Sequence, residues 1–240
     1  MKGQFLNKAF HTLTEAFQNC LKRFPTTVCF VLALTAYLAY LVSTEMDDEK
    51  KLTLVLGYYF SVGTLLSLTL HLWSEEIKNR IKEISVHIVM HVLLIADAVY
   101  LYSLSPERSL TEISIAHGAA ILALWLSVFF LSFTQEKNDI PSWNFASYTV
   151  GAFVTANVVG LIMSGGISLL VFSLHQLFDV DVSWKCYLYI LVVCSVLLPM
   201  LLFLGMLPKN KLKHNQEPQP SEFLNGTIHF LFLPLMAGYL

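Results

Sequence analysis

Between Ile84 and Leu104 the chain reads ISVHIVMHVLLIADAVYLYSL, an apolar stretch with one acidic side chain, Asp97, and no Lys or Arg. The hydrocarbon core of a bilayer is about 30 Å thick and a helix rises about 1.5 Å per residue, so about 20 such residues span it. Apolar runs near this length recur at 25–42, 52–73, 84–104, 113–133, 145–173 and 186–207, and a seventh runs from 223 to 240. The pattern predicts an all-α, polytopic transmembrane helix bundle with six complete spans and a truncated seventh.

The composition of the whole chain agrees with a lipid environment. Of the 240 residues, 55% are hydrophobic and only 13% are charged, whereas about a quarter of a typical soluble domain is charged. The net charge of −2 argues against nucleic acid as a partner, because duplex binding needs a basic face. The predicted partner is therefore the lipid bilayer. The cysteines form no CxxC pair, so we expect buried thiols rather than a disulfide framework.

The Lys and Arg residues predict the orientation, because cytoplasmic loops carry an excess of them. With the N-terminus in the cytoplasm, eleven of the 15 fall on the cytoplasmic side, namely Lys2, Lys8, Lys22, Arg23, Lys78, Arg80, Lys82, Lys137, Lys209, Lys211 and Lys213. The external cations are Lys50, Lys51, Arg108 and Lys185. The sequence thus predicts a multi-pass protein with a cytoplasmic N-terminus.

Residues 1–24 form a separate predicted unit ahead of the bundle, which we place at 25–240. Apolar side chains recur there at helical spacing, with Lys8, Lys22 and Arg23 nearby. This pattern is typical of an amphipathic helix on the cytoplasmic leaflet; a helix packed on the cytoplasmic loops is the alternative. At the other end the chain is still apolar at Leu240, so we expect it to be the N-terminal part of a longer protein.

The fifth run carries small residues four positions apart, which lets another helix approach closely. They are Ala152, Ala156, Gly160, Ser164 and Ser168. The pair Gly165 and Gly166 interrupts this row. Tight helix packing is the interpretation we favour, and a broken helix that lines a cavity is the alternative.

Ionisable side chains inside the runs form a candidate polar cluster. Asp97 is the only acid within a span, and a charge at that depth must face the interior, find a partner or be protonated. The other members are His87, His91, His117, His71 and His229. One hypothesis is a proton path or metal site, since imidazole titrates near neutrality and binds metals. The other is a set of interhelical hydrogen bonds that fix the packing.

Signatures of catalysis are mostly missing from the sequence. The pair His87 and His91 lacks the Glu of an HExxH motif, and the residues around Ser164 do not form a GxSxG elbow. No P-loop and no GxGxxG motif occurs. We therefore predict no catalytic residues, no metal site and no cofactor.

Several short stretches resemble an uncharacterised bacterial family of polytopic inner-membrane proteins, a domain-of-unknown-function family frequent in Bacteroidetes. They are YYFSVG (58–63), LHLWSEE (70–76), EKNDIPSWNF (136–145), MSGGIS (163–168) and FLNG (223–226). The resemblance implies a bacterial inner membrane, and it implies no mechanism or catalytic residue. Members of the family continue beyond the equivalent of this chain's end, which suits the expected further C-terminal region.

Three functional hypotheses follow from these patterns. The leading one is a transporter or channel-like protein with an ionisable interior around Asp97. The rival is a membrane scaffold or partner subunit held by small-residue packing, with a membrane-protein partner or the further C-terminal region beside it. Metal-dependent catalysis inside the membrane ranks last, because a general base is missing. The sequence indicates no particular substrate.

Overall fold

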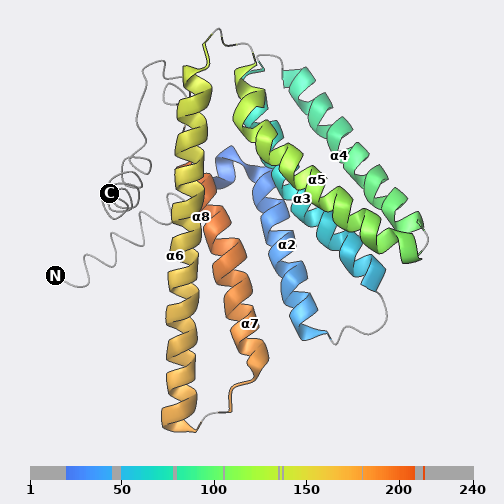
Figure 1. Ribbon diagram of the computed structural model, residues 1–240. Coiled ribbons are helices and arrows are strands. Elements are labelled where there is room, and N and C mark those ends of the chain that lie inside the picture. The colour runs from blue at the N-terminus through green and yellow to red at the C-terminus, as the bar shows by residue number, and fades with distance from the viewer. Residues whose placement is uncertain are drawn as a thin grey trace, which may run out of the picture.

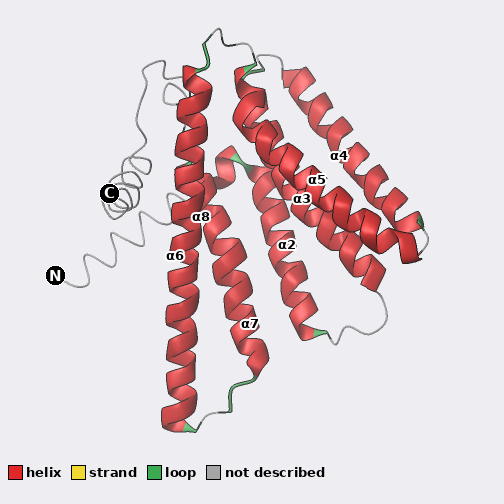
Figure 2. Cartoon of the chain, viewed as in Figure 1, coloured by secondary structure: helices red, strands yellow, loops and turns green. Residues whose placement is uncertain are grey.

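The computed structural model describes residues 20–44, 50–77, 80–104, 106–134, 136, 138–179, 181–208 and 213. Every regular element within these residues is a helix (Figure 2). Six helical segments are long and apolar enough to cross a membrane. The prediction of an all-α polytopic bundle is therefore confirmed, and the protein is a multi-pass membrane protein.

The helices follow one another along the chain as labelled in Figure 1. They are α2 (Pro25–Ser43), α3 (Lys50–Ser74), α4 (Arg80–Ser103), α5 (Pro106–Phe130) with the 3-10 turn η1 (Leu131–Phe133), α6 (Ile140–Phe178), α7 (Trp184–Val192), the π-helical turn η2 (Val193–Leu197) and α8 (Leu198–Met206). The last three form one continuous span.

The largest difference from the predicted spans concerns α6, which extends beyond the predicted 145–173 at both ends. Pro141 lies in its first turn, where the missing N–H costs no helical hydrogen bond. Asp179 follows its last turn with a φ of 53°, and this left-handed conformation ends a helix. The 39 residues make a helix of about 58 Å, so α6 must tilt or extend into the headgroup region.

Two predicted segments lie outside the described residues. Of the amphipathic helix expected over 1–24, only 20–24 is described, and 20–23 is helical. The truncated seventh span expected over 223–240 lies wholly outside. Both segments stay predictions.

The second half of helix α3 is surrounded by protein. It packs against α2, α4 and α5, and every residue from Val62 to Leu70 is buried. Thr64 and Thr69 tolerate this burial because each hydroxyl donates to the carbonyl four residues earlier, at 2.8 and 2.9 Å. Leu66 packs with Leu94 of α4 in a buried apolar core.

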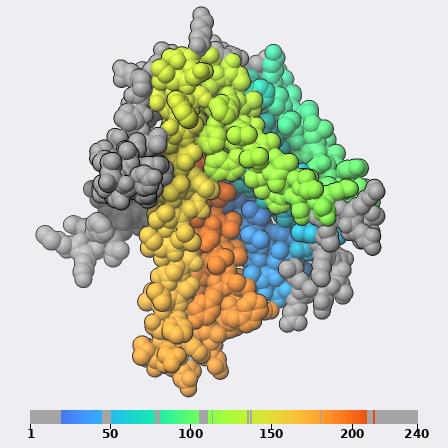
Figure 3. All heavy atoms as spheres, viewed as in Figure 1, coloured from blue at the N-terminus to red at the C-terminus, as the bar shows by residue number. Residues whose placement is uncertain are grey.

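The bundle has two halves, with α2 between them (Figure 1). Helices α3, α4 and α5 form the α3–α5 half, and α6, α7, η2 and α8 form the α6–α8 half. Helix α2 packs against α3 on one side and against α7 and η2 on the other. The ribbon shows the halves approaching each other near the end of α8 and diverging toward the start of α7. In the space-filling view, the end of α6 and the start of α7 project beyond α5 (Figure 3).

A second apolar core joins the two halves where they approach. It contains Leu72 of α3, Phe133 of η1, Phe145 of α6 and Leu204 of α8, together with Phe24 just before α2. We call this end of the bundle the joined end. The ends of α3, η1 and α8 all lie there.

Gly160 marks a close crossing of α6 over the interrupted helix α7–α8. Pro199 has no N–H to continue the α-helical hydrogen bonds, and the helix widens into the π turn just before it. A Cβ on Gly160 would fall within 2.5 Å of Pro199 Cγ and closer still to the Cys194 carbonyl oxygen. Only glycine fits at this crossing.

The other small residues of α6 divide into two groups. Ala152, Ala156 and Gly160 are buried, whereas a Cβ on Gly165 or Gly166 would meet no atom of the described residues within 4 Å. Ser164 and Ser168 are half-buried. Helix α6 runs unbroken through both glycines, so the broken-helix alternative is wrong for this structure.

Replacement of Gly160 by Ala should destabilise the protein by about 1–3 kcal/mol, because the clash is with backbone that cannot rotate away. The matched change Gly165→Ala adds the same methyl group to open space and should be neutral or slightly stabilising. Thermal unfolding in detergent measures both. Equal melting temperatures for Gly160→Ala and the parent would contradict the crossing.

Candidate functional site

Asp97 of α4 has a partner inside the bundle. Its carboxylate accepts a hydrogen bond from the hydroxyl of Tyr58, a buried residue of α3. The acid is half-buried, so it lies between two helices rather than in lipid. This hydrogen bond offsets part of the cost of placing a carboxyl group at membrane depth.

His117 of α5 reaches the same part of α3. Its Nε2 lies 2.8 Å from Ser61 Oγ, and its ring meets the Tyr58 ring edge-on at a centroid distance of 5.6 Å. Tyr58 therefore contacts both Asp97 and His117. We call Tyr58, Ser61, Asp97 and His117 the Asp97 cluster.

The other histidines form a second group nearer the joined end. The His71 and His87 rings lie 4.9 Å apart, and the His87 and His91 rings stack at 6.2 Å. We call these three side chains the histidine row. Thr26 of α2 contacts one end of the row, with Oγ1 at 2.7 Å from His71 Nε2. Ser67 contacts the other end, at 3.1 Å from His91 Nε2.

Hydrogen bonding defines the tautomer at His91. Its Nδ1 lies 2.8 Å from the His87 carbonyl oxygen, which can only accept, so Nδ1 carries the proton. Nε2 of a neutral ring then accepts from Ser67. His87 differs, because its Nε2 is buried without a hydrogen-bond partner among the described residues.

The structure therefore divides the candidate polar cluster of the sequence into two groups. Asp97 and His117 meet α3 at Tyr58 and Ser61, whereas His91 meets it at Ser67 and His87 meets it at His71, which is itself a residue of α3. The six positions from Ser61 to Ser67 correspond to a rise of about 9 Å along the helix. His229 lies outside the described residues. Within the part of the chain that is described, no group of three or more His, Cys, Asp or Glu is arranged to hold a metal ion.

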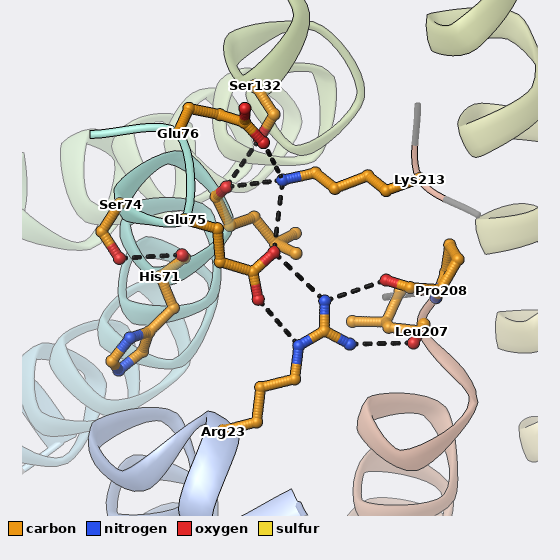
Figure 4. A network of polar contacts seen from close by, with 10 residues as sticks. Arg23, His71, Ser74, Glu75, Glu76, Ser132, Leu207, Pro208 and Lys213 are labelled. Atoms are coloured by element: carbon orange, nitrogen blue, oxygen red, sulfur yellow. Dashed lines mark hydrogen bonds and ion pairs between the residues drawn. The ribbon is translucent and has the colours of Figure 1, made fainter. Parts of the chain in front are cut away.

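A network of charged residues occupies the joined end (Figure 4). Arg23 donates from Nε and Nη2 to the two carboxylate oxygens of Glu75, at 2.8 and 3.2 Å. The same guanidinium donates to the carbonyls of Leu207 and Pro208, at 2.8 and 2.9 Å. One side chain thus connects the start of α2, the end of α3 and the end of α8.

Lys213 approaches Glu75 from the side opposite Arg23 (Figure 4). It is only 1% exposed, and its ammonium group donates to Glu76, Glu75 and the Leu72 carbonyl at 2.8, 3.3 and 2.8 Å. Ser132 of η1 donates to the same carbonyl at 2.9 Å. The three N–H groups of the lysine all have acceptors, which explains how a charge is tolerated there. We call Arg23, Glu75, Glu76 and Lys213 the ionic network.

The ionic network is not predicted by the amino-acid sequence, in which the cations indicate only the orientation of the spans. The structure gives several of them a second role at helix C-termini, where carbonyls lack helical partners and the dipole is negative. Arg23 and Lys213 cap α8 and α3, while Lys51 and Lys185 donate to the carbonyls of Leu104 and Ser43 at the opposite end. The adjacent acids Glu75 and Glu76 at the end of a span were the one available signal.

The fold and these sites define an α-helical, multi-pass membrane protein with hydrogen-bonded polar groups in its interior. No protein-family model, no curated protein and no solved structure matches this chain. The resemblance to the uncharacterised inner-membrane family therefore stays a prediction. The function is inferred below from the geometry of the described residues.

The ionic network predicts a specific dependence of stability on pH. Burial alone would raise the pKa of the Glu75 carboxyl group, but Arg23 and Lys213 outweigh this effect and hold the pKa below its ordinary value of 4.5. A carboxyl group with a lowered pKa stabilises the fold above 4.5 and loses that contribution as the pH falls through its folded-state pKa. The Glu75→Gln variant should melt below the parent at neutral pH, and the gap should shrink in acid.

Thermal unfolding in detergent across neutral and acid pH measures this gap. Glu112→Gln removes an exposed carboxylate of α5 outside the network, and it should keep the parent's profile. A gap between Glu75→Gln and the parent that stays constant down to acid pH would contradict the assignment.

Proposed function

We propose that the protein lies in a bacterial inner membrane with its joined end in the cytoplasm, and that it passes protons through the bundle interior as a channel-like protein. The membrane assignment rests on the six apolar helices, and the bacterial location rests on the family resemblance. The proton pathway rests on one observation: the Nε2 of His87 is buried and has no hydrogen-bond partner in the part of the chain that the structure describes, and its ring lies between two other imidazoles.

The distribution of positive charge supports the orientation. The sequence assigns eleven of the 15 Lys and Arg residues to the cytoplasmic side, and two of these, Arg23 and Lys213, form the ionic network at the joined end, as expected for a cytoplasmic face. Two of the exceptions, Lys51 and Lys185, cap helix C-termini at the opposite end. Their positions therefore have a local structural cause that does not conflict with the orientation.

Thiol labelling on intact cells tests the orientation. In a version without native cysteines, Asp179→Cys should react with an impermeant maleimide, whereas Thr134→Cys should react only after permeabilisation. Both side chains are exposed at helix ends on opposite sides of the bundle. Labelling of Thr134→Cys alone on intact cells would reverse the assignment.

The histidine row supports proton passage because helix packing alone does not explain the buried Nε2 of His87, the central imidazole. A buried polar atom without a partner costs about 1–3 kcal/mol, and packing would favour an apolar residue there. Imidazole can instead take a proton on one nitrogen and release one from the other near neutral pH. The row begins at His91, which contacts Ser67, and ends at His71. His71 lies one helical turn before Glu75 at the joined end.

The Asp97 cluster would continue the path toward the other side. It lies about 9 Å further along α3, and water would have to bridge that step. Within it, Tyr58 contacts both Asp97 and His117. The path would then follow α3, with titratable side chains in both parts of the membrane.

The hydrogen bond between Tyr58 and Asp97 favours a second candidate function, a membrane scaffold. It joins α3 to α4, and the Ser61–His117 and Ser67–His91 contacts join α3 to α5 and α4 in the same way. Such bonds are worth about 1 kcal/mol each in a membrane and can serve packing alone. The two candidates differ in whether the row of histidines conducts.

Proton flux into liposomes distinguishes them. Purified protein reconstituted with an internal pH-sensitive dye and an inside-negative potential should acidify faster than empty liposomes. The His87→Asn variant should lose most of the flux, because an amide cannot exchange protons near neutral pH. The control His175→Asn changes a histidine of α6 that belongs to neither the row nor the Asp97 cluster, and it should keep the flux. Folded parent protein with no flux above empty liposomes would favour the scaffold instead.

A further inference from the structure

We propose that the ionic network is a latch that holds the two halves of the bundle together at the joined end and opens without unfolding either half. Two features of the described residues carry this proposal: the position of the apolar cores, and the way charge is divided between the halves.

The cores show where the halves are joined. One buried core lies within the α3–α5 half, around Leu66 and Leu94. The other joins both halves and contains Leu72, Phe133 and Leu204. The described residues form no third core between the diverging ends of the halves. A separation of the halves therefore has to start at the joined end.

Charge is divided between the elements that meet there. The end of α3 contributes the acids Glu75 and Glu76 and the Leu72 carbonyl, whereas the cations come from Arg23, before α2, and Lys213, after α8. Arg23 also holds the last carbonyls of α8. Every ion pair in the network thus links α3 to an element outside the α3–α5 half.

Partial exposure makes these contacts exchangeable. The Glu75 side chain is 33% exposed and that of Glu76 is 29% exposed, so water can replace the cations as the carboxylates' partner. Ion pairs in such surroundings contribute less than apolar packing of the same size. Each half keeps its own helix contacts when the network breaks.

Cys20 provides a native reporter of this opening. It is 4% exposed and belongs to the apolar core of the joined end. Cys194 is 6% exposed and lies at the Gly160 crossing within the α6–α8 half. Opening of the latch should expose Cys20 to solvent, whereas Cys194 should stay buried. Each cysteine is studied alone, with the other three replaced by Ser.

The experiment measures the rate of maleimide labelling in nanodiscs at neutral pH. Glu75→Gln removes the central carboxylate, and Lys213→Met removes the charge while keeping the volume of the buried side chain. We expect both variants to label Cys20 about tenfold faster or more, because each loses charge-assisted hydrogen bonds, and to leave the Cys194 rate unchanged. Glu112→Gln is the matched control and should leave both rates unchanged.

Two results would overturn the latch. Unchanged labelling of Cys20 in both variants would mean that apolar packing alone closes the joined end. Faster labelling of both cysteines in both variants would mean that the network supports the whole fold. Neither readout depends on proton flux, so the latch and the proposed function can fail separately.

Discussion

Hydrocarbon offers no partner to a polar group, and this constraint organises the structure around helix α3. Tyr58, Ser61 and Ser67 carry hydroxyl groups into the membrane, and each contacts an acid or imidazole on a neighbouring helix. Thr64 and Thr69 of the same helix donate to carbonyls of their own helix. Burial of α3 on all sides from Val62 to Leu70 and the arrangement of α4 and α5 follow from the same need.

The helix ends obey a related constraint in a more polar setting. Terminal carbonyls have no helical partner, and at four helix C-termini a Lys or Arg supplies one. At the joined end these cations also meet Glu75 and Glu76, so capping and ion pairing become one network. The network connects elements far apart in sequence, and Lys213 reaches back to Leu72 over 141 positions.

Local sequence information accounts for most of the spans, because apolar length and helix rise alone predict their bounds within a few residues, although α5 begins at Pro106 and not at the predicted 113. It underestimates α6, since Ser142, Asn144, His175 and Gln176 interrupt the apolar run at its two ends but lie inside the helix. Local sequence does not predict which side chain each interior polar group contacts. That Asp97 faces Tyr58 rather than His87 or His91 depends on how α4 packs on α3, and periodicity within one helix carries no such information. The ionic network was missed for the same reason, because its members lie on separate segments.

From Val62 to Leu70, α3 is enclosed by protein, whereas α4 exposes a row of large apolar side chains that we assign to lipid. Footprinting of the native protein in nanodiscs with a lipid-soluble diazirine, read by mass spectrometry, tests this arrangement without any mutation. The account predicts carbene modification of exposed α4 side chains such as Ile88, Val92 and Val99, and none from Val62 to Leu70. Modification of that α3 segment at the level found on α4 would contradict the arrangement.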